Sequence, residues 1–361
     1  MSLPIVRSGR YDLVCLTSMG VRLMPEVAMP IHTMNHFYLQ ATSAETNVLN
    51  VAASLGRSCL ALTKFVDKSP VARIIQNQLR QRNISYRGLQ VEQGGPWGFR
   101  HQFNIADSGF GSRGPRVWND RAGEVGCTLR ATDFDLQRLF HQEGVSILHL
   151  SGLIAALSQD TTECCLELVR QARSAGTLVS FDLNYRATFW QGREMELREA
   201  FRKIASQAHI LLGNEEDFQL CFGLETGLEK VGNLENQLEI EGFKSLIQQV
   251  RKEFPRAEVF ATSLRQVISA NHHLWGGVLW ADGRWFVEEP RPIQVLDRIG
   301  GGDGFAGGIL YGILSGWEPQ KWLQFGWAAG AMAAGSINDY AEPADERQLW
   351  DMYAGRARVQ R

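Results

Sequence analysis

The sequence predicts an α/β protein with a doubly wound, mostly parallel sheet, helices on both of its faces and a small second β-sheet beside it. Apolar runs alternate with amphipathic stretches along most of the chain, which is the pattern of βαβ units. Two segments rich in Gly, Pro, Met, His and Arg, residues 17–40 and 92–122, interrupt this rhythm and predict the strands of the small sheet. The 361 residues, 44% of them hydrophobic, suffice for one large α/β domain or two smaller ones.

The expected elements follow in order from residue 11. The apolar run YDLVCL (11–16) predicts a buried strand, and residues 45–56 have helical spacing that ends at a glycine, a typical C-cap. A second strand (58–65) and an amphipathic helix (69–83) complete the first units. Further strands are expected at 146–150, 177–183, 209–214, 258–264, 275–281 and 284–289, and helices at 160–176, 195–208 and 243–254.

Two polar stretches are expected at the surface. Residues 226–240 have no apolar stripe and are expected to form a surface insertion. The adjacent His272 and His273 would point to opposite faces of a strand, so a solvated loop is expected there. The eight histidines of the chain show no metal-binding spacing.

Charge and cysteine content narrow the class of protein. The formal charge of −2, with acids and bases mixed along the chain, favours neither a nucleic acid nor an anionic membrane as partner. The six cysteines lack the CxxC pairing of a zinc site and are expected to be buried thiols. The N-terminus lacks a signal-peptide pattern, and no apolar run approaches the roughly 18 residues of a membrane span. These observations predict a cytoplasmic protein.

The motif DRIGGGDGFAGG, residues 297–308, concentrates glycine where a strand-like run passes into a helical one. Gly300, Gly301 and Gly302 stand at the expected helix start, where unpaired N–H groups and the helix dipole favour an anion. Glycines allow that backbone to approach a phosphate without interference from a Cβ atom. The motif therefore predicts a phosphate-binding turn.

Asp303 follows these glycines in the first helical turn. It can stabilise the helix start, or it can act as a general base that takes the proton of an attacking hydroxyl. Because the helix N-terminus favours the charged form, a carboxylate is expected at neutral pH. The formal match of residues 302–307 to the dinucleotide pattern GxGxxG is set aside, because too little chain follows for the βαβ units which that pattern requires.

The motif resembles the C-terminal signature of the ribokinase-like (PfkB-type) carbohydrate kinases. HLSGLIAALS (149–158) and FDLNYRATFW (181–190) resemble segments of 2-keto-3-deoxygluconate kinases in that family. GNEEDF (213–218) resembles its N-x-x-E region, with Asp217 in place of the usual glutamate, and ATSLRQVISANHHLWGG (261–277) resembles a strand and loop that carry an arginine. The resemblance implies one ribokinase-like kinase domain over residues 1–361, with a small β-lid formed by about residues 17–40 and 92–122 that closes over the substrate.

The resemblance also implies a role for each matching residue, and arginine suits a sugar-acid carboxylate because its planar fork donates two hydrogen bonds. The arginines among them can also be surface or ion-pairing side chains. ATP and Mg²⁺ would be the cofactors, a sugar or a sugar acid resembling 2-keto-3-deoxygluconate the substrate, and a homodimer through the lid is an expected assembly. The implied roles are catalysis for Asp303, Gly300, Gly301 and Gly302, nucleotide binding for Asn214, Arg265 and Gly302, substrate binding for Asn47, Arg113, Arg186 and Asp303, and water-mediated magnesium binding for Asp217.

The front of the expected substrate site departs from the family pattern. Thr42 and Ser43 stand where relatives carry a Gly-Gly pair, and Thr17 and Ser18 stand where many relatives carry Gly-Glu. Added Cβ atoms reshape a pocket and disfavour the left-handed conformation that glycine permits. Two alternatives to a sugar-acid kinase therefore remain open: a non-catalytic nucleotide or sugar-acid sensor, and a kinase for fructose or another neutral sugar.

Overall fold

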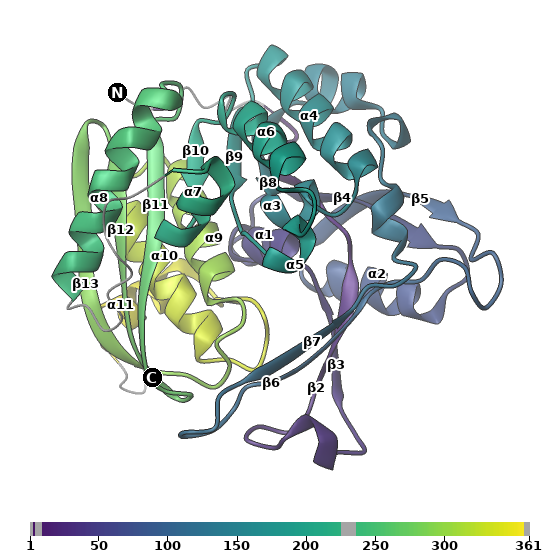
Figure 1. The fold of residues 1–361 in the computed structure, drawn as a ribbon, viewed down its shortest axis with the longest axis horizontal. Coiled ribbons are helices and arrows are strands. Elements are labelled where there is room, and N and C mark those ends of the chain that lie inside the picture. Colours follow the sequence, from purple (N-terminus) through teal and green to yellow (C-terminus); the bar gives the residue numbers. More distant parts are fainter. Residues whose placement is uncertain (1–2, 4–8, 225–235, 357–361) are drawn as a thin grey trace.

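The computed structural model describes residue 3 and residues 9–224 and 236–356, which form a nine-stranded sheet and a separate four-stranded sheet (Figure 1). The large sheet has the order β13-β12-β11-β10-β9-β8-β1-β4-β5, and all its pairs are parallel except β11–β12 and β12–β13. The predicted α/β class with a mostly parallel sheet is confirmed. The strands are β1 (Tyr11–Leu16), β4 (Cys59–Val66), β5 (Ile84–Val91), β8 (Val145–Ser151), β9 (Leu178–Asp182), β10 (Ile210–Leu212), β11 (Val259–Ser269), β12 (His272–Ala281) and β13 (Arg284–Gln294).

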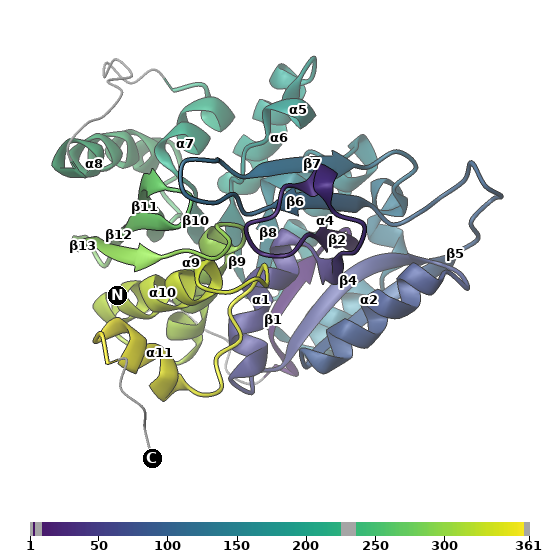
Figure 2. The same ribbon diagram turned by 90° about the horizontal axis from the view of Figure 1, so that it is seen from below.

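Helices cover both faces of the large sheet, as Figure 2 shows, and bury one hydrophobic cluster on each face. One face carries α1 (Ala44–Ser54), α2 (Pro70–Gln81), α9 (Gly301–Leu314), α10 (Pro319–Ala334) and α11 (Glu346–Tyr353). The other carries α3 (Gly152–Ala155), α4 (Gln159–Ser174), α5 (Ala187–Trp190), α6 (Glu194–Ala205), α7 (Glu215–Phe222) and α8 (Asn236–Glu253). Within the described residues, no helix combines the length and the apolar character that a membrane span requires.

The small sheet projects from the main body as the lid (Figure 1). Its strands are β2 (Gly20–Met24), β3 (Tyr38–Thr42), β6 (Phe103–Asp107) and β7 (Arg116–Asp120), in the order β3-β2-β6-β7. β2 follows the end of β1, and β6 follows the end of β5, so the lid is attached where two strands of the large sheet end. The predicted small β-lid is confirmed as part of the fold class.

Some local expectations differ from the structure. The histidine pair lies not in a solvated loop but at the start of β12, because Asn271 makes a tight turn and the hairpin continues directly; His273 is buried. The edge strand β5 and helix α10 have no counterpart in the sequence-based expectations, because β5 carries polar residues on both faces and α10 is rich in small residues. Most of the expected insertion 226–240 lies outside the described residues, and α8 begins at Asn236.

The topology locates the place where a ligand can bind. β1 pairs with β4 on one side and β8 on the other, so the chain proceeds along the sheet in opposite directions from this point. Open α/β sheets bind ligands at the carboxyl ends of the strands at such a switch point. The lid strands begin beyond the carboxyl end of β1, and the glycine-rich start of α9 packs against α1, which follows the lid hairpin.

Candidate active site

A cavity of about 1160 Å³ lies at this edge of the sheet, lined by the lid, the loops after β9 and β10, and the first turn of α9. It brings together residues that are far apart in the sequence, as expected for a site at the carboxyl ends of parallel strands. Arg113 is the one predicted site residue that does not line it. Those that do are Asn47, Arg186, Asn214, Asp217, Arg265, Gly300, Gly301, Gly302 and Asp303.

The turn that begins α9 presents free amides to the cavity. Gly300 caps the helix with a φ of 82°, and a Cβ here would lie 1.7 Å from the carbonyl oxygen of Asp339. A Cβ at Gly302 would meet nothing within 4 Å. Among the described residues, no backbone carbonyl accepts a hydrogen bond from the amides of Gly301, Gly302 and Asp303. The turn therefore requires Gly300, whereas Gly302 leaves open space beside free donors, which suits a phosphate group.

Asp303 lies half-buried in the wall of the cavity, where Asn47 of α1 donates from Nδ2 to its Oδ2 at 2.9 Å. Burial raises the pKa of Asp303 to about 8, the Asn47 hydrogen bond lowers it, the charges of Asp182 and Glu45 raise it, and Arg186 lowers it. The expectation of a carboxylate at neutral pH is wrong for this structure, because lost hydration outweighs the helix dipole. A group that titrates near the working pH is well placed to exchange a proton.

Two more carboxyl groups surround Asp303. Glu45 of α1 is fully buried and accepts hydrogen bonds from Thr17 Oγ1, at 2.7 Å, and from the Ser151 hydroxyl. Burial raises the pKa of Glu45, and burial together with the charge of Asp217 raises the pKa of Asp182 to about 7. The cavity therefore concentrates acidic groups whose charged forms are poorly solvated, and a bound cation would lower their pKa values.

Asn214 and Asp217 cap the start of α7 reciprocally. The Asn214 Oδ1 atom accepts from the Asp217 amide at 2.8 Å, and Asp217 Oδ2 accepts from the Asn214 amide at 2.9 Å. Asp217 Oδ1 accepts from the amide of Tyr185 at 3.1 Å, which joins the loop after β9 to α7. Because these bonds hold both side chains in place, the two residues form a fixed wall of the cavity.

The donor set near α7 fits a magnesium ion that is carried mainly by a nucleotide. Within the described residues, no cluster of three or more His, Cys, Asp or Glu side chains has the arrangement of a dedicated metal site. Mg²⁺ keeps several waters in ATP-using enzymes and takes one or two carboxylates together with substrate phosphates. Asp182 and Asp217 face the same cavity, and each oxygen of Asp217 is already held by an amide, which suits contact through water.

Two arginines form the basic side of the cavity near the free amides. Arg265 of β11 and Arg298, which lies just before the glycine turn, both line the cavity, and neither has an ion-pair partner in the described part of the chain. Burial and then the charge of Arg298 lower the pKa of Arg265. Two unpaired guanidinium groups beside amide donors suit a polyphosphate.

Arg113 and Arg186 were both expected to face the substrate, but the structure places them differently. Arg186 lines the cavity and donates to the carbonyl oxygen of Tyr185 at 2.8 Å. The Nη1 atom of Arg113 instead pairs with Asp107 at 2.9 Å, away from the cavity lining. Arg113 sits in the lid tip between β6 and β7, so its lid neighbour takes up its charge. The lid arginine that does line the cavity is Arg121.

The side chains that replace the Gly-Gly pair are bonded within the protein. Thr42 ends β3, and its Oγ1 donates to Asp339 Oδ2 at 2.7 Å. Ser43 is the N-cap of α1, with an extended φ of −164°, and its hydroxyl accepts from the Thr46 amide at 3.1 Å. Neither position needs the left-handed conformation, so the backbone here accommodates side chains without strain. Both hydroxyl-bearing residues line the cavity.

Among the lining residues that sequence reasoning missed are Arg121, His273 and Arg298. Arg298 stands inside the glycine motif, one residue before Ile299, so its position next to the expected phosphate-binding turn could have identified it. Arg121 stands in the predicted lid segment 92–122, but the sequence cannot tell which lid arginine faces inward. His273 was missed because the turn at Asn271 was assigned to a longer loop.

Comparison with known proteins identifies the family. Residues 30–346 match the model of the pfkB family carbohydrate kinases. A 2-dehydro-3-deoxygalactonokinase of Haloferax volcanii is 26% identical over 323 residues, 89% of this chain and 90% of its own length. A 5-dehydro-2-deoxygluconokinase of Clostridium beijerinckii is 27% identical over 332 residues, 91% of this chain and 89% of its own length.

A solved structure supports the fold. The 2-dehydro-3-deoxygluconokinase of Thermotoga maritima superposes with a TM-score of 0.84 at 23% identity, covering 96% of this chain and 98% of that one. At this identity the likeness concerns the fold alone. Because the family match spans most of the chain, this protein belongs to the PfkB family of carbohydrate kinases and is an enzyme of that class.

Proposed function

We propose that this protein transfers the γ-phosphoryl group of ATP to a hydroxyl of a small sugar or sugar acid, with Asp303 as the general base. The observation that carries the proposal is the position of Asp303 beside the free amides of Gly301 and Gly302 in one cavity. Phosphoryl transfer needs this combination, because the amides stabilise charge on the moving group while the carboxylate accepts the hydroxyl proton.

The chain's own residues would act in one in-line step. The acceptor hydroxyl gives its proton to Asp303 while its oxygen forms a bond to the γ-phosphorus, and ADP leaves with the electrons of the broken P–O bond. Asn47 holds Oδ2 of Asp303, which leaves Oδ1 for the hydroxyl. The amides at Gly300–Gly302 form the anion hole for the phosphoryl oxygens.

Asn214 and Arg265 would bind the nucleotide phosphates. The unpaired charge of Arg265 and the fixed position of Asn214 on the cavity wall support these roles. Asp217 would hold a magnesium ion through water, and such an ion neutralises phosphate charge when bound. These assignments place the nucleotide between α7, β11 and the start of α9.

A sugar acid resembling 2-keto-3-deoxygluconate is the first candidate acceptor, because the names of the related kinases from Haloferax and Clostridium describe such substrates. Arg186 and Asn47 would contact it at the lid end of the cavity. A neutral sugar is the second candidate, and a specific observation favours it: Arg121 Nη1 lies 2.9 Å from both carboxylate oxygens of Glu124. That internal carboxylate already neutralises the lid arginine.

ADP release with a panel of acceptors tests the proposal. The panel contains 2-keto-3-deoxy sugar acids, the related 5-keto acid, fructose, ribose and glucose, each with ATP and magnesium. We expect saturable ADP formation with at least one acceptor and none with acceptor omitted. A protein that binds ATP but releases ADP with no member would instead support a sensor.

The lid supports a homodimer as the assembly of this kinase. Its strands expose large apolar side chains, among them Tyr38 at 55% and Trp118 at 70%. Large apolar side chains exposed on the lid could be covered by a second copy of the chain. Light scattering at micromolar concentration checks this, and a monomer that stays active at that concentration would contradict it.

A further inference from the structure

A buried arginine joins the lid to the loops around the anion hole. Arg22 of lid strand β2 is among the largest fully buried side chains, with no solvent exposure. Its Nη2 pairs with Asp297 and its Nη1 pairs with Asp339. Both carboxylates belong to the main body, one directly before α9 and the other after α10. A charge this deeply buried persists only when paired, so the two carboxylates and the lid strand are held as one unit.

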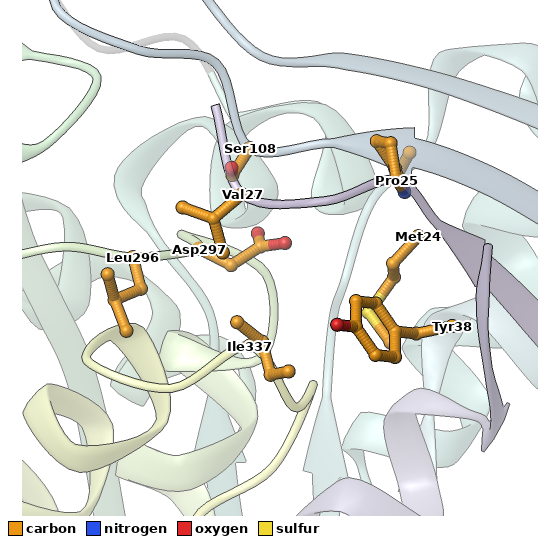
Figure 3. Close-up of a pocket in the computed structure, with 9 residues that line it drawn as sticks. Met24, Pro25, Val27, Tyr38, Ser108, Leu296, Asp297 and Ile337 are labelled. Carbon is orange, nitrogen blue, oxygen red and sulfur yellow. The ribbon is translucent and has the colours of Figure 1, made fainter. Parts of the chain in front are cut away.

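Figure 3 shows the surroundings of this junction. Residues of the lid and of the main body line one small cavity here: Met24 and Tyr38 of the lid lie together on one side, Leu296 of the main body lies on the other, and Val27 of the lid lies close to Asp297. The Asp297 side chain lies among them. The ion pairs therefore lie where the lid meets the main body rather than inside either part.

The same two carboxylates border the anion-binding turn. Asp297 Oδ1 accepts from the Ile299 amide at 3.0 Å, which fixes the turn that leads to Gly300. The backbone of Asp339 packs so closely on Gly300 that a Cβ atom there would collide with its carbonyl. Thr42 at the cavity wall donates to Asp339 as well. Any displacement of the carboxylates would therefore shift the amides that follow Gly300.

We propose that Arg22 is a positioning residue for phosphoryl transfer, which holds the anion-hole amides and Asp303 in register with the acceptor bound under the lid. The inference rests on the proposed function. Arg22 stands opposite Gln40 of β3 and Asn104 of β6 in the lid sheet, and Asn104 lines the cavity. One side chain thus ties the acceptor side to the phosphate side.

The chemistry of the Arg22 guanidinium fits a positioning role better than a role in packing alone. A buried ion pair contributes little net stability compared with apolar side chains of the same size, so stability by itself does not call for an arginine here. The planar guanidinium carries two terminal nitrogens at a fixed spacing, and each holds one carboxylate. A lysine ammonium offers its three donors from a single nitrogen, so both carboxylates would have to approach the same atom.

Two variants test the proposal in the full-length protein: Arg22→Lys, which keeps the charge, and Arg22→Met, which removes it. The matched control is Arg87→Met; Arg87 pairs with Glu143 at 2.6 Å on the edge strand β5, away from the cavity lining. Misplaced catalytic groups cost about 10²-fold in rate, so we expect kcat to fall about 100-fold in Arg22→Met and about 10-fold in Arg22→Lys. KM for the acceptor should change much less than kcat, and Arg87→Met should keep the wild-type kcat.

Chemical rescue separates positioning from folding. Millimolar guanidinium ion should restore part of the kcat of Arg22→Ala and leave Arg87→Met unchanged, because the ion can occupy the space between Asp297 and Asp339. Folded Arg22 variants with kcat within about threefold of wild type would overturn the proposal. Failure of all three Arg22 variants to fold would overturn it too, since the guanidinium would then maintain the fold rather than the site.

ATP affinity distinguishes this proposal from the proposed function. If the wild-type protein releases ADP with no acceptor, the proposed function fails, but calorimetric ATP binding still reports on the anion hole. We then expect Arg22→Met to bind ATP at least about tenfold more weakly than wild type, because misaligned amides lose charge-assisted hydrogen bonds. Equal ATP affinity in a folded Arg22→Met protein would overturn the positioning role.

Discussion

The two ends of the cavity are built by different means. The end where we propose that phosphate binds presents free amides after Gly300, open space at Gly302, and the unpaired charges of Arg265 and Arg298. The end where we propose that the acceptor binds is made of side chains that are already bonded within the protein, such as Thr42. A phosphate site of the first kind accepts any ligand with the right charge, whereas selectivity at the second depends on which internal bonds the ligand must match.

The largest expected effect is the loss of the base at the junction of the two ends. Asp303→Asn keeps the shape and the hydrogen bond to Asn47 but cannot accept a proton, so kcat should fall by at least about 10³-fold. The assay is ADP release with the best acceptor of the panel, and circular dichroism checks the fold. Turnover within tenfold of wild type would refute the role of Asp303.

The open space at the phosphate end gives the next effect. Gly302→Ala places a methyl group where a phosphoryl oxygen would lie and keeps it from the anion-hole amides, and the loss of one such contact costs about 10²-fold in kcat. Since this Cβ meets nothing within 4 Å, the melting temperature should stay at the wild-type value. Gly300→Ala is the matched contrast, because its collision with the Asp339 carbonyl should lower the melting temperature. An active Gly302→Ala enzyme would show that phosphate binds elsewhere.

The raised pKa of Asp303 predicts a pH dependence of both rate and stability. Because the base must be deprotonated, kcat/KM in the free enzyme should rise about tenfold per pH unit up to a pKa of about 8. The native state also holds this proton more tightly than the unfolded state, so this group's contribution to stability is present at low pH and is lost as pH rises towards 8. Asp303→Asn should lose less melting temperature than wild type between pH 5 and pH 9. Parallel curves for the two proteins would contradict a raised pKa.

The ion pair at the acceptor end predicts a smaller change in specificity. Glu124→Gln keeps an acceptor for the Ser18 hydroxyl but frees the charge of Arg121. The freed guanidinium of Arg121 can then donate charge-assisted hydrogen bonds to the carboxylate of a sugar acid. The ratio of kcat/KM for sugar acids to kcat/KM for neutral sugars should therefore rise about five- to tenfold. An unchanged ratio would mean that Arg121 does not contact the acceptor.

The smallest effect is expected at Arg113. Because Arg113 pairs with Asp107 in the lid tip and does not line the cavity, Arg113→Met removes no contact with the acceptor and should change kcat/KM for any acceptor by less than about twofold. Arg186 does line the cavity, so Arg186→Met serves as the comparison variant and should raise KM for the acceptor. A larger loss for Arg113→Met than for Arg186→Met would place Arg113 in the closed site.

Much of the phosphate end could be predicted from the sequence. Helix starts, caps and glycine turns depend on residues close together in the chain, so the glycine turn at the start of α9 and the position of Asp303 in its first helical turn followed from one motif. The alternation of strands and helices predicted the α/β class, and the two segments that interrupt it predicted the small sheet. The edge strand β5 and the helix α10 were not predicted, because the periodicity of their apolar residues is weaker.

The acceptor end and the proton affinity of the base were decided only by the tertiary structure. The choice of Arg121 over Arg113 depends on how β6 and β7 lie against the main body, and the pairing of Arg22 with two distant aspartates depends on the packing of the lid. The pKa of Asp303 depends on burial and on charges from other elements, which no local pattern contains. Turns and helix caps depend on neighbouring residues and can be predicted from them, whereas burial and long-range ion pairs exist only once the chain has folded.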